Sequence, residues 1–288
     1  MNHPKQHTLW LLAALTAPIA HYSGAGWFTA ALTALVGLPL TLLPRRWNDM
    51  PKPVAYLEVV WLGIVAGLLL PGSAANWPSD NTRVVPLTIL ALAIFTNAAA
   101  APRIGAVLAL CMAILAIPVG VTASARIEPE WLPPTTGPWS PGLALILLLP
   151  ALPEAGEKKR RIAYAALLTV LLTVLVQGIL SPQVAASVAD PFYQTARTLG
   201  HLEPVVAVGL TLGWYVLTCF LLQNAATIAK GSDIKPKIAI TLAAATAAIT
   251  ILFPWQRNKT LITSLTALLW LIAPLSRKIT AQLKGRPF

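Results

Sequence analysis

Three neutral polar side chains recur at helical spacing within one apolar stretch of the chain, residues 205–228. Thr211, Tyr215 and Thr218 follow one another at intervals of four and three positions, so a helix places them on one face. Hydroxyl groups donate and accept hydrogen bonds, and a group of them in an apolar segment can bind a small polar ligand. Threonine and tyrosine also form hydrogen bonds between membrane helices. The spacing is compatible with both a ligand pocket and helix packing.

No other arrangement of residues points to catalysis. The sequence lacks a nucleophile beside a general base, a pair of carboxylates inside an apolar segment and a glycine-rich phosphate loop. Cys111 and Cys219 lie within apolar stretches without a histidine cluster nearby, so we interpret them as core residues and expect no metal site. Asn97 and Gln177 are expected to form hydrogen bonds between helices. We therefore expect neither an enzyme nor a cofactor.

Acidic residues avoid the centres of the apolar stretches. Asp190 and Glu203 fall in one connecting segment, and Glu58 lies near the start of its stretch, where solvent or Lys52 can satisfy it. A carboxylate at the centre of a bilayer costs about 2.5–3.5 kcal/mol on insertion scales. A proton relay through charged side chains is therefore not expected.

The composition indicates an all-α polytopic membrane protein. The chain has 288 residues, of which 56% are hydrophobic and 11% charged, whereas a soluble domain carries about 25% charged residues. The apolar segments cover 9–22, 27–43, 54–70, 84–100, 104–121, 139–152, 162–180, 205–228, 238–254 and 261–275. We predict ten transmembrane helices in a single domain, 1–288, with one repeat over about 9–121 and a second over about 139–275.

The distribution of positive charge predicts the topology. Sixteen of the 21 Lys and Arg residues fall in alternate gaps between the ten segments. By the positive-inside rule, these gaps and both termini are cytoplasmic and the protein lies in the cell membrane. The formal charge of +11 does not form one basic face, so nucleic acid is not the expected partner. We expect the basic cytoplasmic face to contact anionic lipid headgroups.

The first segment has a second interpretation. Lys5, the run Leu9–Ala20 and the small residues Ser23-Gly24-Ala25 also resemble a signal peptide cleaved before Gly26. Cleavage would leave nine spans and a mature N-terminus outside the cell. The N-terminal residue of the purified protein distinguishes the two interpretations.

Segments 1 and 6 are shorter than a regular spanning helix. The twelve residues Leu9–Ala20 reach about 18 Å and contain Pro18, while Pro141-Gly142 and Pro150 flank the clean run Leu143–Leu149. Short segments broken by Pro or Gly at matching places in two halves indicate a transporter-type binding site. Proline is also common in membrane helices, so an unbroken helix is the alternative.

Two stretches resemble a known family. Asp190-Pro191-Phe192-Tyr193-Gln194-Thr195-Ala196-Arg197-Thr198-Leu199-Gly200, followed by Glu203 and a span with Trp214, is similar to the B-subunit family of spore germinant receptors. Leu149-Pro150-Ala151-Leu152 with the basic run Lys158–Arg161 resembles the end of segment 6 in that family. These spore permeases belong to the amino acid–polyamine–organocation superfamily, whose fold is a five-plus-five inverted repeat with broken segments 1 and 6. Pro141 stands where we expect an acidic residue in relatives.

The resemblance implies a binding site, because segment 8 faces the break in segment 1 in this superfamily. The implied ligand-binding residues are Thr16, Ala17, Pro18, Ile19, Ser140, Gly142, Thr211, Tyr215 and Thr218. The implied ligand is a small molecule such as an amino acid, captured by the loose backbone of segments 1 and 6.

The resemblance also implies a function in spore germination. The chain would be a germinant receptor subunit, or a related transporter, with other receptor subunits as partners and the inner spore membrane as its location if the host sporulates. A ten-span drug/metabolite-type exporter is one alternative, against which the long connection 181–204 argues. A non-transporting membrane scaffold is the other.

Overall fold

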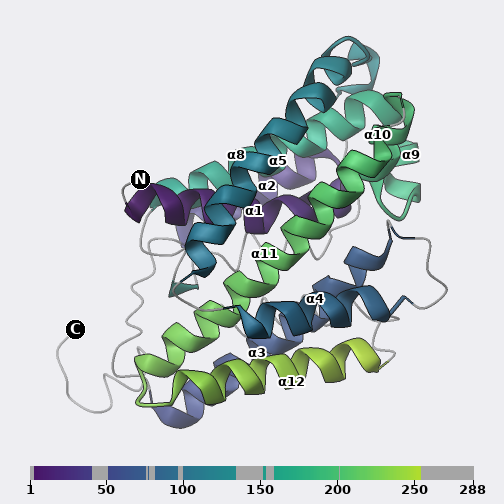
Figure 1. Cartoon of the computed structure of the whole chain (residues 1–288). Helices are drawn as coiled ribbons and strands as arrows, with labels where there is room; N and C mark the ends of the chain where they lie inside the picture. The colour runs from purple at the N-terminus through teal and green to yellow at the C-terminus, as the bar shows by residue number, and fades with distance from the viewer. Residues whose placement is uncertain are drawn as a thin grey trace.

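The computed structural model describes residues 3–40, 51–75, 77, 82–96, 100–133, 152–153, 159–200 and 202–253. Within these ranges all regular secondary structure is helical (Figure 1), so the predicted all-α class is confirmed there. The elements are α1 (His3–His21), η1 (Ser23–Ala25), α2 (Trp27–Leu40), α3 (Lys52–Leu69), η2 (Leu70–Ala74), α4 (Val84–Phe95), α5 (Ala101–Ser124), η3 (Pro129–Trp131), α8 (Lys159–Leu180), α9 (Pro182–Ser187), α10 (Pro191–Thr198), α11 (Glu203–Lys230) and α12 (Pro236–Leu252).

Eight of the ten predicted segments coincide with helices in the structure. Segment 10, and segment 6 apart from Leu152, lie outside the described residues. Among the described residues, four helices are long and apolar enough to cross a membrane, namely Lys52–Ala74, Ala101–Ser124, Arg160–Leu180 and Glu203–Lys230. This is compatible with a membrane protein.

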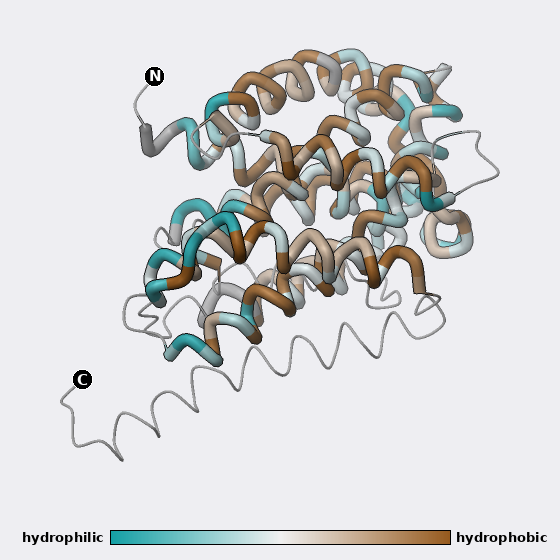
Figure 2. The backbone as a smooth tube through the Cα atoms, turned by 60° about the horizontal axis from the view of Figure 1, so that its bottom comes forward, coloured by the Kyte–Doolittle hydropathy of each residue, from teal (hydrophilic) through white to brown (hydrophobic). Residues whose placement is uncertain are grey.

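Much of the exterior along the helices is apolar. On α5, the side chains of Val107, Ile114 and Val121 are 60%, 65% and 67% exposed. Figure 2 shows hydrophobic residues along the lengths of the helices and hydrophilic residues gathered toward several helix ends. An apolar belt between polar ends is the surface that lipid, not water, solvates.

Side-chain contacts establish the relative directions of the helices. Gly63 of α3 lies against Ala243 of α12, and Gly67 lies against Ala247, so these two helices are parallel. The absence of a Cβ at the two glycines permits this approach, because a Cβ at Gly63 would lie 2.4 Å from the carbonyl oxygen of Ala243.

The first helix is antiparallel to α11. Trp10 packs edge-on against Phe220, and Ala17 lies against Gly213. Trp10 also lies against Gly105 near the start of α5, so α1 and α5 start at the same end of the bundle. These directions agree with alternate crossings of consecutive segments.

The helices form two groups that meet along α11. One group is α3, α4, α11 and α12: α11 and α12 contact each other and both α3 and α4, and η2 contacts both α3 and α4. The other is α1, α2 and α8, and α1 also contacts α5 and α11. Figure 1 shows α3, α4 and α12 together below, α1, α2 and α8 above, and α11 running diagonally between them.

The predicted break in segment 1 is wrong. Helix α1 continues through Pro18 to His21, and the amide of Tyr22 donates a hydrogen bond to the carbonyl oxygen of Pro18 at 3.1 Å. The helix begins at His3, in polar residues that hydropathy alone excludes, and its 19 residues reach about 28 Å. Contacts with α5, α8 and α11 stabilise it despite the proline.

Candidate functional site

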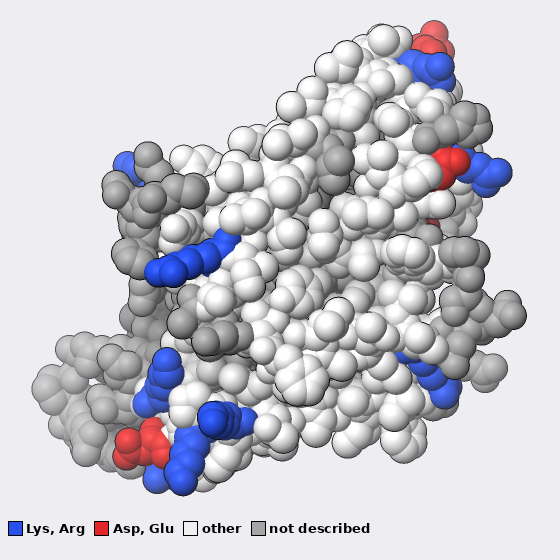
Figure 3. Space-filling model, viewed as in Figure 1, with Lys and Arg blue, Asp and Glu red and all other residues white. Residues whose placement is uncertain are grey.

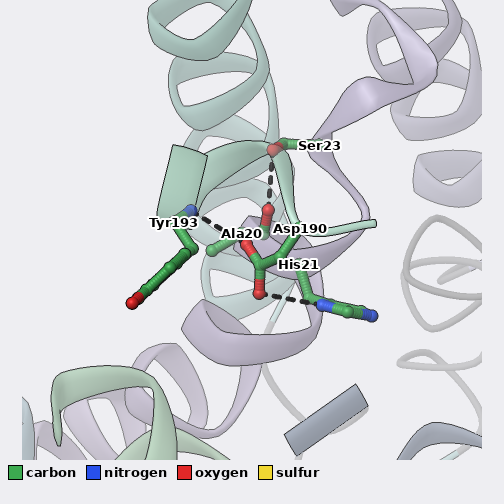
Figure 4. A network of polar contacts seen from close by, with 5 residues as sticks. All are labelled: Ala20, His21, Ser23, Asp190 and Tyr193. Carbon is green, nitrogen blue, oxygen red and sulfur yellow. Dashed lines mark hydrogen bonds and ion pairs between the residues drawn. The ribbon is translucent and has the colours of Figure 1, made fainter. Parts of the chain in front are cut away.

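A buried hydrogen bond links the end of α1 to the start of α10. The Nδ1 of His21 lies 2.9 Å from Oδ2 of Asp190 (Figure 4), and the two residues are 8% and 6% exposed. The other carboxylate oxygen, Oδ1, accepts a hydrogen bond from the amide of Tyr193 at 2.9 Å. The Asp190 carboxylate therefore forms hydrogen bonds both with His21 at the end of α1 and with the first turn of α10.

Local sequence explains why α10 begins here. Asp190 is its N-cap and Pro191 its first residue, a combination that favours helix initiation. Ser23 donates to the carbonyl oxygen of Ala20 at 2.6 Å and closes the turn after α1. Gly24 then approaches α9 so closely that a Cβ would lie 2.2 Å from the carbonyl oxygen of Ala185. Only glycine permits this contact.

Tyr22 lies in the turn that follows α1. Its ring packs edge-on against His21, with a centroid distance of 4.5 Å. Burial of the phenol and, second, the negative charge of Asp190 raise the pKa of Tyr22 above its ordinary value of 10.0. The phenol is therefore neutral at physiological pH.

The same histidine contacts the other helix group. His21 and Trp214 of α11 pack edge to face at 5.9 Å between ring centroids. Gly72 of η2 fits against both rings, since a Cβ there would lie 2.8 Å from Cδ2 of His21 and 2.9 Å from Cζ2 of Trp214. Residues of α1, η2 and α11 therefore meet at one point.

Two polar atoms at this point have no hydrogen-bond partner in the described part of the chain. They are Nε1 of Trp214 and Oγ of Ser73, on residues that are 0% and 1% exposed. A buried polar group left unpaired costs about 1–3 kcal/mol. We call His21, Ser73, Asp190 and Trp214 the outer junction.

A cap of short elements covers this end of the bundle. The Nε2 of Gln177 donates to the carbonyl oxygen of Trp131 at 2.6 Å, and its Oε1 accepts from the amide of Trp27 at 3.4 Å. Arg126 donates to the carbonyl oxygen of Thr198 at 2.6 Å. The prediction that Gln177 connects separate segments is confirmed.

Most hydroxyls of the predicted pocket bond to their own helices. Thr16 donates to the carbonyl oxygen of Leu12, Thr211 to that of Ala207 and Thr218 to that of Trp214, each at 2.8 Å. Ala17, Pro18 and Ile19 are buried within α1. Ser140 and Gly142 lie outside the described residues.

Thr211 and Tyr215 face α4 and its preceding loop. The Tyr215 hydroxyl lies 2.6 Å from Oγ1 of Thr96, and the indole of Trp77 donates to Thr211 at 3.0 Å. Gly213 is the residue of α11 that faces α1, because it lies against Ala17. Position 215 lies about 200° around the helix from Gly213, so Tyr215 faces away from α1. These contacts favour the helix-packing interpretation of the two hydroxyls.

A small cavity lies between α4, α5, α11 and α12. Its volume is about 20 Å³, and it is lined by Ala93, Ile94, Thr96, Ala101, Cys219, Leu222, Gln223 and Ile240. That volume accommodates about one water molecule. It is too small for an amino acid.

Of the two partners predicted for Glu58, bulk solvent and Lys52, the burial of Glu58 disfavours solvent. Its residue is 8% exposed, so protein and not bulk water surrounds most of the side chain.

No protein-family model matches the chain, and the search of curated proteins finds no match.

Proposed function

We propose that this chain is a multi-pass membrane protein that binds a small polar solute, such as an amino acid, where its two helix groups meet. The observation that carries the proposal is the outer junction. There, His21 from one group packs against Trp214 and Gly72 of the other, Ser73 follows Gly72 in the chain, and two buried polar atoms have no partner among the described residues. A solute carboxylate accepts hydrogen bonds from both an indole N–H and a serine hydroxyl.

The helix contacts support the five-plus-five repeat. Segments 2 and 7 are α2 and α8, segments 3 and 8 are α3 and α11, and segments 4 and 9 are α4 and α12. Each of these pairs is in contact, and each lies within one group. A shift of five segments inverts the direction of crossing, as an inverted repeat requires. Substrates of such proteins bind at the interface between repeats.

The correction to segment 1 changes the proposed mechanism. Because α1 stays helical through Pro18, it has no unwound backbone there that could capture a ligand, although Pro18 itself donates no hydrogen bond. Side chains at the end of α1 take this role instead. A germinant receptor subunit or a related transporter remains our proposal, and the folded α9 and α10 in the connection 181–204 argue against an exporter with tight loops.

Ligand-induced thermal stabilisation of the purified full-length protein tests the proposal. We expect one or more of the twenty amino acids to raise the unfolding midpoint. Trp214→Phe retains an aromatic ring but replaces the indole by a smaller phenyl group without the N–H, so it should weaken binding about tenfold, as should Ser73→Ala. Trp77→Phe is the matched control, since it removes an indole N–H that donates to Thr211 instead.

If none of the twenty amino acids raises the unfolding midpoint, the solute site is rejected and a membrane scaffold is favoured. Equal loss in Trp77→Phe and Trp214→Phe would also contradict the solute site. Uptake of the radiolabelled solute into proteoliposomes then separates transport from sensing, because only a transporter accumulates it.

A further inference from the structure

The two ring nitrogens of His21 have different surroundings. Nδ1 lies 2.9 Å from Oδ2 of Asp190 (Figure 4), whereas a Cβ at Gly72 of η2 would lie 3.0 Å from Nε2. The residue is 8% exposed, and Nε2 forms no hydrogen bond with the described residues. A nearly buried ring nitrogen therefore lies against η2, within the outer junction, without a polar partner there.

Asp190 determines which nitrogen carries the proton of a neutral imidazole. The helix dipole favours a carboxylate at the N-cap of α10, and the oxygens of a carboxylate accept hydrogen bonds but do not donate them. Nδ1 therefore donates to Oδ2, which leaves Nε2 as an unprotonated acceptor. Binding of a proton at Nε2 converts this acceptor into a second donor.

Few cations are available to this histidine. Tyr22 packs against its ring as a neutral phenol, and η1, η2 and the last turns of α5 and α8 carry no ionisable side chain. Further ionisable residues on the elements at this end are Tyr193 and Arg197 of α10 and Glu203 of α11.

The cations of the bundle lie elsewhere or on its surface. Arg197 is exposed, and the Lys and Arg residues visible in Figure 3 lie toward the helix ends. Among the described residues, Arg161 is the one buried Lys or Arg, and it lies near the start of α8, at the opposite end of the bundle. The imidazole is therefore the buried group of the outer junction that can become a cation.

We propose that His21 binds a proton together with a solute carboxylate, so that its imidazolium donates to Asp190 through Nδ1 and to the solute through Nε2. This inference rests on the proposed function and specifies the solute as a carboxylate. Two carboxylates on either side of a neutral imidazole would be two buried negative charges without a cation, which is strongly unfavourable. The N–H bond at Nε2 forms with a proton from the surrounding water, and the proton returns to water when the solute leaves.

Calorimetry of the full-length protein in neutral detergent measures this proton. The probe is the amino acid that raises the unfolding midpoint most among the twenty, titrated in buffers of different ionisation enthalpy. A histidine ordinarily titrates near about pH 6.5, so at about pH 8 we expect uptake of about one proton per bound amino acid. The Kd should rise about tenfold per pH unit between about pH 7.5 and 8.5. The amino alcohol with the same side chain has no carboxylate and should bind more weakly, without proton uptake.

Two histidines of α1 provide a variant and its control. His21→Gln retains an N–H donor but does not titrate, so it should bind the amino acid without proton uptake and with a Kd independent of pH. His7→Gln, near the start of the same helix, is the matched control and should take up about one proton, as the unmodified protein does.

The outcomes separate this inference from the proposed function. Binding without proton uptake by the unmodified protein would overturn the coupling and leave the solute site standing, and this measurement requires no variant to fold. Undiminished uptake in His21→Gln, or equal loss in His7→Gln, would overturn the role of His21. If none of the twenty amino acids binds, the proposed function fails and this inference fails with it.

Discussion

Gly105 shows how one missing side chain determines the packing of α1. A Cβ at this position would lie 2.0 Å from Cδ1 of Trp10, whose ring is 1% exposed. Gly105→Ala must therefore displace the indole, and overpacking of this kind costs about 1–3 kcal/mol. We expect a lower unfolding midpoint by differential scanning fluorimetry.

Gly120 on the same helix is the matched control, because a Cβ there meets nothing within 4 Å. Gly120→Ala should leave the midpoint unchanged or raise it, since alanine favours a helix by about 0.5–1 kcal/mol over glycine. Equal destabilisation by the two substitutions would show that helix composition, and not the contact with Trp10, limits stability.

Tyr22 makes the free energy of unfolding depend on pH in the alkaline range. Its pKa is raised in the folded protein above the ordinary 10.0, first by burial and then by the charge of Asp190. Above pH 10 the unfolded chain releases this proton while the folded chain retains it, so the free energy of unfolding falls as pH rises. Below pH 10 the contribution is fully present. Tyr22→Phe should remove this part of the decline above pH 10, measured by thermal unfolding. An identical pH profile in the variant would contradict it.

At the scale of elements, Asp190 holds α10 against the end of α1. Asp190→Asn retains Oδ1, which caps α10, but replaces the oxygen that pairs with His21 by a donor. Hydrogen bonds to charged groups contribute about 1.5–3 kcal/mol, so local opening of α10 should become at least about tenfold more frequent. Trypsin cleavage after the exposed Arg197 reports this opening. Ser187→Ala, which removes only a hydrogen bond within α9, should cleave at the unmodified rate.

The elements themselves were largely predictable, but their partners were not. Hydropathy located eight helices, because burial in lipid leaves long apolar runs. Hydropathy missed the start of α1, since that first turn is polar. The prediction of a break at Pro18 was wrong because packing against other helices compensates for the hydrogen bond that proline cannot donate. His21 and Asp190 each end or follow an apolar run, yet 169 residues separate them, so no local pattern pairs them. The contacts of Tyr215 with Thr96 likewise depend on helix rotation, which spacing alone leaves open.

Across the whole molecule, charge separates between the two ends of the bundle. The basic end carries Lys52, Arg103, Arg160, Arg161, Lys230, Lys235 and Lys237 together with the acidic Asp233, whereas the end with α10 carries Arg83, Arg126 and Arg197 together with Glu128, Glu130, Asp190 and Glu203. An apolar belt lies between them. This separation is what the positive-inside rule requires of a protein whose basic end is cytoplasmic.

Labelling from one side of the membrane tests that arrangement. In a variant with Cys111 and Cys219 replaced by alanine, a cysteine at Arg197 should react with an impermeant maleimide added to intact cells. A cysteine at Arg160, exposed at the start of α8, should react only after permeabilisation. Both residues are exposed, so the side of the membrane on which each cysteine lies, and not burial in the protein, determines whether it reacts in intact cells. Labelling of both sites in intact cells would place the two ends on one side and contradict a spanning bundle.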